Sequence, residues 1–227
     1  MSGTQDPARD TDQLDVDDGT QHTSAMFIRD ISPLSAIADS DPRKFLSEEA
    51  ALRQEARDLA EAVREQYATS NTLAVDVFGI SEKMGLPVFE RLLNMESVKQ
   101  TDATWVSGVL EKLKGNDFAT IYVEARDPLV RQRFSAAHEI WHWLTHIKGR
   151  TPEEIRSMEF WDVREPEGEI TISEYSGDMF AHMLLLPRYA VQSELASGYS
   201  LRAMAERALV SQRTMENRLR QLALIGI

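Results

Sequence analysis

Residues 134–142 read Phe-Ser-Ala-Ala-His-Glu-Ile-Trp-His, and this stretch decides how the rest of the chain is interpreted. On a helix, side chains four positions apart project from one face, so His138 and His142 can bind one tetrahedral Zn²⁺ together. Glu139 lies about 100° round the helix from His138, too far to be a third ligand. It can reach a water molecule beside the metal and act as its general base. The alternative is a helix whose two histidines only pack or face solvent.

A catalytic zinc needs a third protein ligand and an open position. A metzincin would place a third histidine where this chain has Lys148, and His146 lies a full turn beyond His142, from where it would reach the same metal poorly. We interpret His146 as a helix-end histidine that is hydrogen-bonded to a neighbour. Glu174 and Asp178 again stand four positions apart on a predicted helix. Glu174 is therefore the candidate third ligand and Asp178 the acceptor for the far nitrogen of a ligand histidine; the alternative is a solvated acidic face.

The hydrophobic pattern around these motifs predicts mostly helices with a few strands. Ser47 is the expected N-cap of the first helix, Gly85 the stop of the second, and Thr151-Pro152 the start of another. Residues 114–117 form the expected turn between two strands. We expect helices over 47–67, 75–84, 131–147, from Thr151, and over 174–186, strands over 87–92, 105–113 and 118–123, a loop over 159–173, and two short closing helices that meet near Val210 and Ser211.

Charge and composition narrow the function classes. The 227 residues include 25 Lys and Arg against 37 Asp and Glu, a net charge of −12, which argues against broad binding to nucleic-acid phosphates. Cysteine is absent, so a disulfide scaffold, a Cys nucleophile and a Cys-ligated metal are excluded. No apolar run approaches the roughly 18 residues that a membrane span needs, and we see no signal peptide. We therefore expect a cytoplasmic protein without membrane or direct nucleic-acid contacts.

The chain divides into three parts. Residues 1–46 form an acidic tail that we expect to be disordered, with six Asp and one Arg before position 25 and an apolar segment over 25–46 that docks on the body or recognises a partner. Residues 47–200 form the predicted zinc metallopeptidase domain. Residues 201–227 form a helix pair like a helix-turn-helix, with five Arg against two Glu. Given the acidic remainder, we expect this pair to pack on the domain rather than bind DNA.

At this level of detail the sequence resembles the ImmA/IrrE metallopeptidases. The stretch from Arg133 to His146 is similar to that family's arginine-phenylalanine-threonine-x-alanine-histidine-glutamate-leucine-glycine-histidine signature, and 174–187 to its second block. The resemblance covers roughly 50–225, with a looser match from Val210 to Leu224. It implies an α+β, mostly helical fold with a thermolysin-like zincin core, in which a small antiparallel sheet packs against the motif helix.

The resemblance also implies a site and a function. It assigns His138, His142 and Glu174 as ligands of Zn²⁺ and Glu139 as the catalytic base, while the sequence itself leaves Mn²⁺ open as the metal. It implies an endopeptidase that cuts a helix-turn-helix (XRE-type) transcriptional repressor and so derepresses mobile-element or stress-response genes. The alternative is an antirepressor that sequesters a regulator without cutting it and holds only a structural zinc.

The sequence departs from the family pattern in two places, and three residues are weaker candidates for a role in the site. Trp141 replaces the usual glycine of the motif, where it fills the core or narrows the cleft, and Ser176-Gly177 replace a common Glu-Ala pair. The candidates for stabilising the oxyanion or contacting substrate are Tyr175, His182 and Tyr189. The sequence does not choose among them, and it leaves the oligomeric state open.

Overall fold

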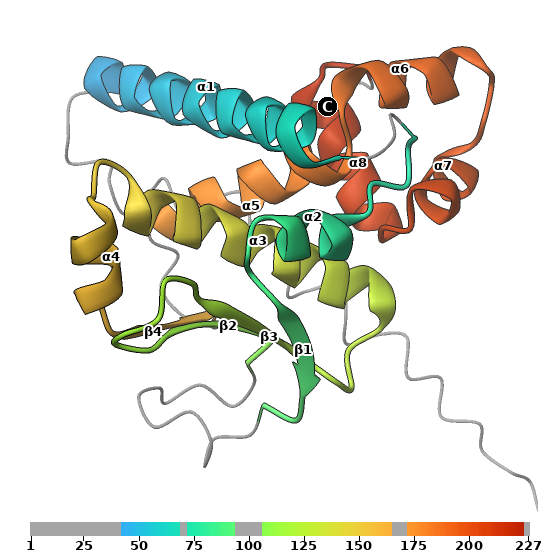
Figure 1. Ribbon diagram of the computed structural model, residues 1–227. Helices are drawn as coiled ribbons and strands as arrows, with labels where there is room; N and C mark the ends of the chain where they lie inside the picture. Colours follow the sequence, from blue (N-terminus) through green and yellow to red (C-terminus); the bar gives the residue numbers. More distant parts are fainter. Residues whose placement is uncertain (1–41, 69–71, 94–105, 165–171, 225–227) are drawn as a thin grey trace, which may run out of the picture. The chain divides into compact units, whose positions relative to one another are not determined.

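The motif helix lies between a small sheet and a layer of further helices (Figure 1). The computed structural model describes residues 42–68, 72–93, 106–164 and 172–224, all within one unit that spans Ser40–Ile227. The predicted tail and docking segment up to residue 41 lie outside the described residues. The elements are α1 (Pro42–Tyr67), α2 (Val77–Lys83), β1 (Val88–Arg91), β2 (Gly108–Lys112), β3 (Thr120–Glu124), α3 (Leu129–Ile147), α4 (Pro152–Ser157), β4 (Phe160–Arg164), α5 (Ile172–Leu185), α6 (Arg188–Ala196), α7 (Leu201–Ala208) and α8 (Gln212–Gln221).

The sheet has the strand order β1-β3-β2-β4. Strand β2 is antiparallel to β3, as expected for the hairpin across residues 114–117, and it is also antiparallel to β4. Strand β1 runs parallel to β3, so the expectation of an antiparallel sheet is wrong at this edge. The chain reverses its direction between β1 and β2 and again between β2 and β3, so that β1 and β3 run in one direction.

Alternate side chains of the sheet face opposite ways, which decides what faces α3. Leu110 and Ile121 are paired across β2 and β3 and belong to the main core with Ile140 of α3. Val109 belongs to a smaller cluster with Tyr122 on the other face. The fold is therefore a mixed helix-and-sheet fold in which α3 packs on one face of the sheet.

Strand β4 corrects the prediction of a loop over 159–173. Phe160 and Trp161 are bulky residues that favour strands, but the Glu-rich stretch that follows them outweighed this signal in the sequence. Asp162 is paired with Leu110 across the β2–β4 ladder, so it lies on the face of the sheet that α3 covers.

The helices continue the layers above α3. Helix α5 packs against α3, and α1 packs against α5 (Figure 1). Helix α1 begins at Pro42 rather than at the expected Ser47, because a proline is well suited to the first helical position, where its missing N–H costs nothing. Ser47 therefore lies inside the helix and is not its N-cap.

The C-terminal part completes the same core. Helix α6 was not expected; it begins directly after Pro187, where the sequence predicted only the end of the preceding helix. Helices α7 and α8 meet at the expected place, and Ser211 caps α8 by accepting a hydrogen bond from the backbone N–H of Thr214 at 3.0 Å. Met215 and Leu219 of α8 are buried in the main core.

The expected cap of α4 is also present. Thr151 and Glu154 form a reciprocal capping box.

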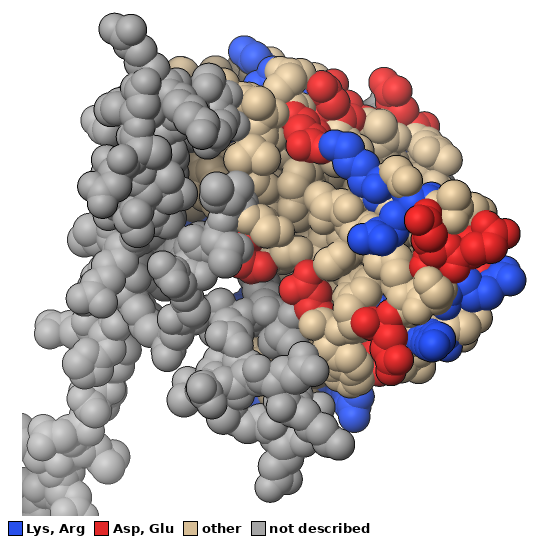
Figure 2. Space-filling model, turned by 90° about the vertical axis from the view of Figure 1, so that its left-hand side faces the viewer, with Lys and Arg blue, Asp and Glu red and all other residues tan. Residues whose placement is uncertain are grey.

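On the face shown in Figure 2, basic and acidic side chains lie next to one another, so neither sign of charge dominates the residues described there. None of the helices in the described ranges is long and apolar enough to cross a membrane.

Candidate metal centre

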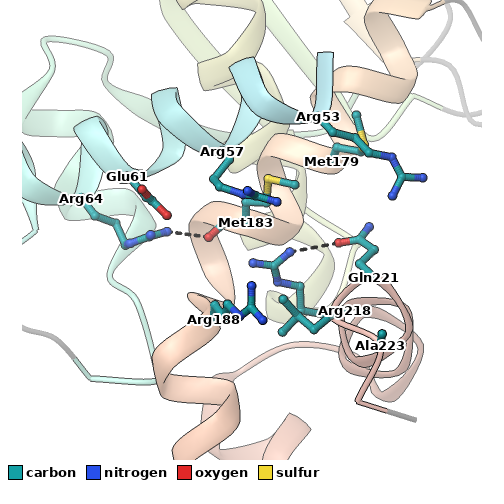
Figure 3. A pocket seen from close by; sticks show the side chains of 11 residues that line it. Arg53, Arg57, Glu61, Arg64, Met179, Met183, Arg188, Arg218, Gln221 and Ala223 are labelled. Atoms are coloured by element: carbon teal, nitrogen blue, oxygen red, sulfur yellow. Dashed lines mark hydrogen bonds between the residues drawn. The ribbon is translucent and has the colours of Figure 1, made fainter. Parts of the chain in front are cut away.

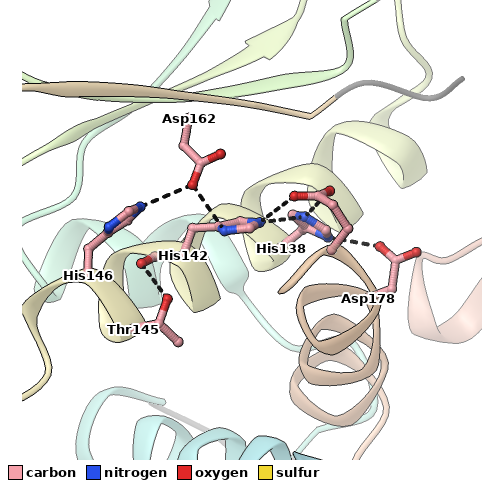
Figure 4. A network of polar contacts seen from close by, with 7 residues as sticks. His138, His142, Thr145, His146, Asp162 and Asp178 are labelled. Atoms are coloured by element: carbon pink, nitrogen blue, oxygen red, sulfur yellow. Dashed lines mark hydrogen bonds and ion pairs between the residues drawn. The ribbon is translucent and has the colours of Figure 1, made fainter. Parts of the chain in front are cut away.

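Helix α3 presents its two motif histidines to one point. His138 and His142 are one turn apart, and their side chains are almost completely buried, with 0% and 3% exposed. Their rings lie on the same side of the helix (Figure 4), and the two Nε2 atoms are 2.9 Å apart. The predicted four-residue spacing thus brings both imidazoles to one place.

The third member comes from the first turn of α5. Oε2 of Glu174 lies 3.2 Å from Nε2 of His138, and Oε1 lies 3.2 Å from Nε2 of His142. Two ligand atoms that each stand 2.0–2.1 Å from a tetrahedral zinc are about 3.3 Å apart. The three residues form a group that could hold a metal ion, with ligand atoms within 4.8 Å of one another. Two imidazole nitrogens and one carboxylate oxygen are suitable ligands for such a metal ion.

Each histidine is oriented by a carboxylate on its far side. Nδ1 of His138 donates a hydrogen bond to Oδ1 of Asp178 at 2.8 Å, as the sequence predicted. Nδ1 of His142 lies 3.1 Å from Oδ2 of Asp162 (Figure 4). With each Nδ1 bonded to a carboxylate, both Nε2 atoms face the same point, which is the arrangement that metal-binding histidines need.

Asp162 is the site residue that the sequence did not reveal. It lies on β4, which was predicted to be loop, and it also accepts a hydrogen bond from Nε2 of His146 at 3.1 Å. His146 is thus bonded to a neighbour, as interpreted from the sequence. The strand-forming residues Phe160 and Trp161 just before Asp162 were the signal that could have placed it on the sheet.

The carboxylates give the site a preference for positive charge. Burial alone would lower the pKa of His142, but hydrogen bonds with Asp162 and Glu174 outweigh it and raise the pKa to about 10. Burial would raise the pKa of Glu174, whereas hydrogen bonds from His138 and His142 lower it to about 2. The site therefore stabilises a cation between its acidic groups, either a proton or a metal ion.

Glu139 is buried on α3 where the helix meets β2, with 1% of its surface exposed. A Cβ atom added to Gly108 of β2 would lie 2.7 Å from its Oε1. Glycine at this strand position therefore makes room for the carboxylate, and any larger residue would displace it.

The two departures from the family motif both lie beside the site. Trp141 is buried in the main core, with its ring centroid 5.8 Å from that of Phe180 on α5, so it fills the core. A Cβ atom at Gly177 would lie 2.8 Å from Cε1 of His138. Gly177 thus allows α5 to approach the first histidine closely.

The three weaker candidates lie in different places. His182 is buried on α5, where its Nδ1 donates to the backbone oxygen of Asp178 at 2.7 Å. The hydroxyl of Tyr175 accepts a hydrogen bond from Arg53 of α1 at 3.3 Å. Tyr189 is half-exposed on α6, where it interacts electrostatically with Arg64. A part in oxyanion stabilisation stays a prediction for each of them.

Two histidines from one helix, a glutamate from a second helix and an acid directly after the first histidine are typical of metallopeptidases. Comparison with family models agrees: the model of the IrrE N-terminal-like domain, Peptidase_M78, matches residues 81–220. This match covers more than half of the chain, and the protein belongs to this peptidase family. The resemblance inferred from the two motifs is thereby confirmed. A search among curated proteins finds no match.

Proposed function

We propose that the chain is a zinc-dependent endopeptidase that cuts one regulatory protein, a helix-turn-helix (XRE-type) transcriptional repressor. The observation that carries the catalytic part is the convergence of three ligand atoms from His138, His142 and Glu174 within 4.8 Å. The family supports a peptidase, and the resemblance of the motifs supports the repressor and the derepression of mobile-element or stress-response genes.

The donor set is compatible with Zn²⁺ and also with Mn²⁺, because imidazole is a suitable ligand for Zn²⁺ and a carboxylate binds either ion. When bound by these residues, the ion would polarise the scissile carbonyl and favour ionisation of the attacking water. The thermolysin-like character of the core belongs to the same proposal and rests on the order of the two motifs.

The protein's own groups orient the site and move the proton. Asp162 and Asp178 hold the imidazoles of His142 and His138 so that both Nε2 atoms keep their direction. Glu139 accepts the proton of the attacking water at its carboxylate. It then delivers this proton to the leaving nitrogen as the peptide bond breaks. Burial of Glu139 beside Gly108 keeps its carboxylate in one place during both transfers.

The test is intact-mass analysis of the repressor encoded next to this protein's gene, after incubation with the metal-loaded chain. We expect discrete fragments with the wild type and none with Glu139→Gln, which preserves size and leaves the three ligands in place. Asp117→Asn is the matched control, because Asp117 is an exposed carboxylate paired with Arg156 on the surface.

The outcomes separate the proposal from its alternative. Cutting by Glu139→Gln at the wild-type rate would show that Glu139 is not the base. A stable complex with both forms and no fragments would favour sequestration with a structural zinc. Neither fragments nor a complex would contradict the choice of substrate.

A further inference from the structure

A polar cavity lies on the other side of α5 from the metal site. Helices α1, α5, α6 and α8 supply the residues that line a pocket of about 350 Å³ (Figure 3). Met183 of α5 lines this pocket, and it lies nine positions after Glu174, half-way round the helix. The lining contains five arginines, Arg53, Arg57, Arg64, Arg188 and Arg218, and a single carboxylate, that of Glu61. In a chain with a net charge of −12, this concentration of positive charge is exceptional.

The deepest arginine is held by neutral groups. Arg218 is 6% exposed, and its Nε donates to the backbone oxygen of Leu186 at 2.9 Å. Its Nη1 donates to the side chain of Gln221 at 3.2 Å. Arg64 likewise donates to the backbone oxygen of Met183 at 2.5 Å. Backbone and amide oxygens orient these guanidinium groups without neutralising them.

The positive charges also act on one another. Burial, as the largest effect, and the nearby charges of Arg64, Arg57 and Arg188 together lower the pKa of Arg218 to about 10, although Glu61 acts in the opposite direction. Within the described part of the chain, no carboxylate forms an ion pair at 4 Å or less with any of these four arginines. Arg218 is thus a buried cation without a close ion-pair partner, and Glu61 is the one carboxylate in the pocket lining, so an anion bound there would be favoured.

We propose that this pocket binds a small phosphate-bearing anion through Arg57, Arg188 and Arg218. The guanidinium fork matches phosphate oxygens in pairs, and a surplus of four positive charges is better balanced by a phosphate group than by one carboxylate. Met179, Met183 and Leu222 offer apolar contacts for the rest of such a ligand. The low exposure of Arg218 favours a small molecule over the backbone of a duplex, which could not reach it.

The phosphate group could come from free inorganic phosphate or from a nucleotide, and one experiment distinguishes them. The full metal-loaded chain is titrated with inorganic phosphate and with ADP at constant ionic strength, and binding is followed calorimetrically. We expect saturable binding at one site. Tighter binding of ADP identifies a nucleotide-like ligand, and equal or tighter binding of phosphate identifies the free anion.

The variants locate the site. Arg57→Gln and Arg188→Gln change exposed side chains and should each weaken binding roughly tenfold or more, since each removes a charged hydrogen bond. Arg202→Gln is the matched control, because Arg202 is an exposed arginine of α7 paired with Glu206, outside the pocket. It should bind as the wild type does. Thermal melts of all variants check that the fold is kept.

Several results would overturn the proposal. The first is that neither inorganic phosphate nor ADP binds saturably. The second is that Arg202→Gln weakens binding as much as the pocket variants do. The third is that succinate or a short DNA duplex binds as tightly as phosphate. Because binding rather than peptide cleavage is measured, a negative result leaves the proposed peptidase function untouched.

Discussion

Oδ2 of Asp162 lies 3.1 Å from Nδ1 of His142, which connects strand β4 directly to the metal-binding face of α3. The same oxygen accepts from Nε2 of His146 one turn further along the helix. One carboxylate thus fixes two imidazoles, of which only the first belongs to the metal group. The edge strand of the sheet is therefore part of the site.

Removing this carboxylate should weaken the metal site without removing a ligand. We expect Asp162→Ala to lower the affinity for zinc roughly 10- to 100-fold, because His142 loses the acceptor that holds its ring. Asp162→Asn retains a carbonyl acceptor and should lose less. Glu174→Ala removes a ligand atom itself and should lose more. Competition with a chelator measures the affinities, and equal values for Asp162→Ala and the wild type would contradict a positioning role.

The close contact between Gly177 and His138 leads to a second prediction. In Gly177→Ala the new Cβ would stand 2.8–3.0 Å from three atoms of the imidazole, so the ring or the helix must shift. We expect weaker zinc binding and slower cleavage, with a smaller effect on the unfolding midpoint. The control is Ala181→Gly, which exchanges the same two residue types in the opposite direction on the same helix. It also opens a small cavity in the core. If Gly177→Ala binds zinc as tightly as the wild type, α5 can adapt and glycine is not required.

How far the sequence predicts this site depends on how local each signal is. Two histidines four positions apart on one helix are determined by helix geometry, so their convergence follows from 138–142 alone. Asp178 follows from the same spacing on a second helix. Asp162 does not, because its place depends on the pairing of β4 with β2, and sheet pairing is a long-range property that the stretch 159–173 does not encode by itself.

The same contrast between local and long-range signals holds for the fold. The cap at Thr151 and the meeting point of α7 and α8 near Ser211 depend on a few neighbouring residues and were predicted at the correct positions. The parallel pairing of β1 with β3 brings together residues that are far apart in the chain, such as Val88 and Ile121. The arginine pocket joins α1 to residues of α5, α6 and α8, more than a hundred positions away, and no local pattern indicates it.

Glu124 at the end of β3 should make the fold sensitive to acid. Its buried carboxylate accepts hydrogen bonds from Arg126 and from the backbone N–H of Leu93, and these interactions, with the bond from the Arg126 side chain as the largest, lower its pKa from 4.5 to about 2. A lowered pKa stabilises the folded state above pH 4.5, and this stabilisation is lost as the pH falls from about 4.5 towards 2.

We therefore expect Glu124→Gln to reduce the free energy of unfolding by roughly 1–3 kcal/mol at pH 7. The difference from the wild type should shrink as the pH falls below 4.5, because protonated Glu124 resembles glutamine. Urea denaturation at several pH values measures it, with Glu153→Gln as an exposed control on α4. A difference that stays constant down to pH 3 would show that the charge of Glu124 is not responsible.

Trp141 occupies the place of the family's usual glycine, and its burial leads to a prediction about stability. Trp141→Gly should lower the free energy of unfolding by about 3–5 kcal/mol through the cavity next to Phe180, with about 1 kcal/mol more from glycine inside a helix. Trp141→Phe should cost much less, because it keeps an aromatic ring and removes a buried indole N–H that has no hydrogen-bond partner among the described residues. Chemical denaturation of both variants measures the costs. An unchanged midpoint for Trp141→Gly would mean that the ring contributes nothing to the core, and the alternative, that it narrows the cleft, would then be preferred. If Trp141→Gly loses much stability and Trp141→Phe does not, this chain uses its tryptophan to join α3 to α5, the two helices that carry the metal-binding residues.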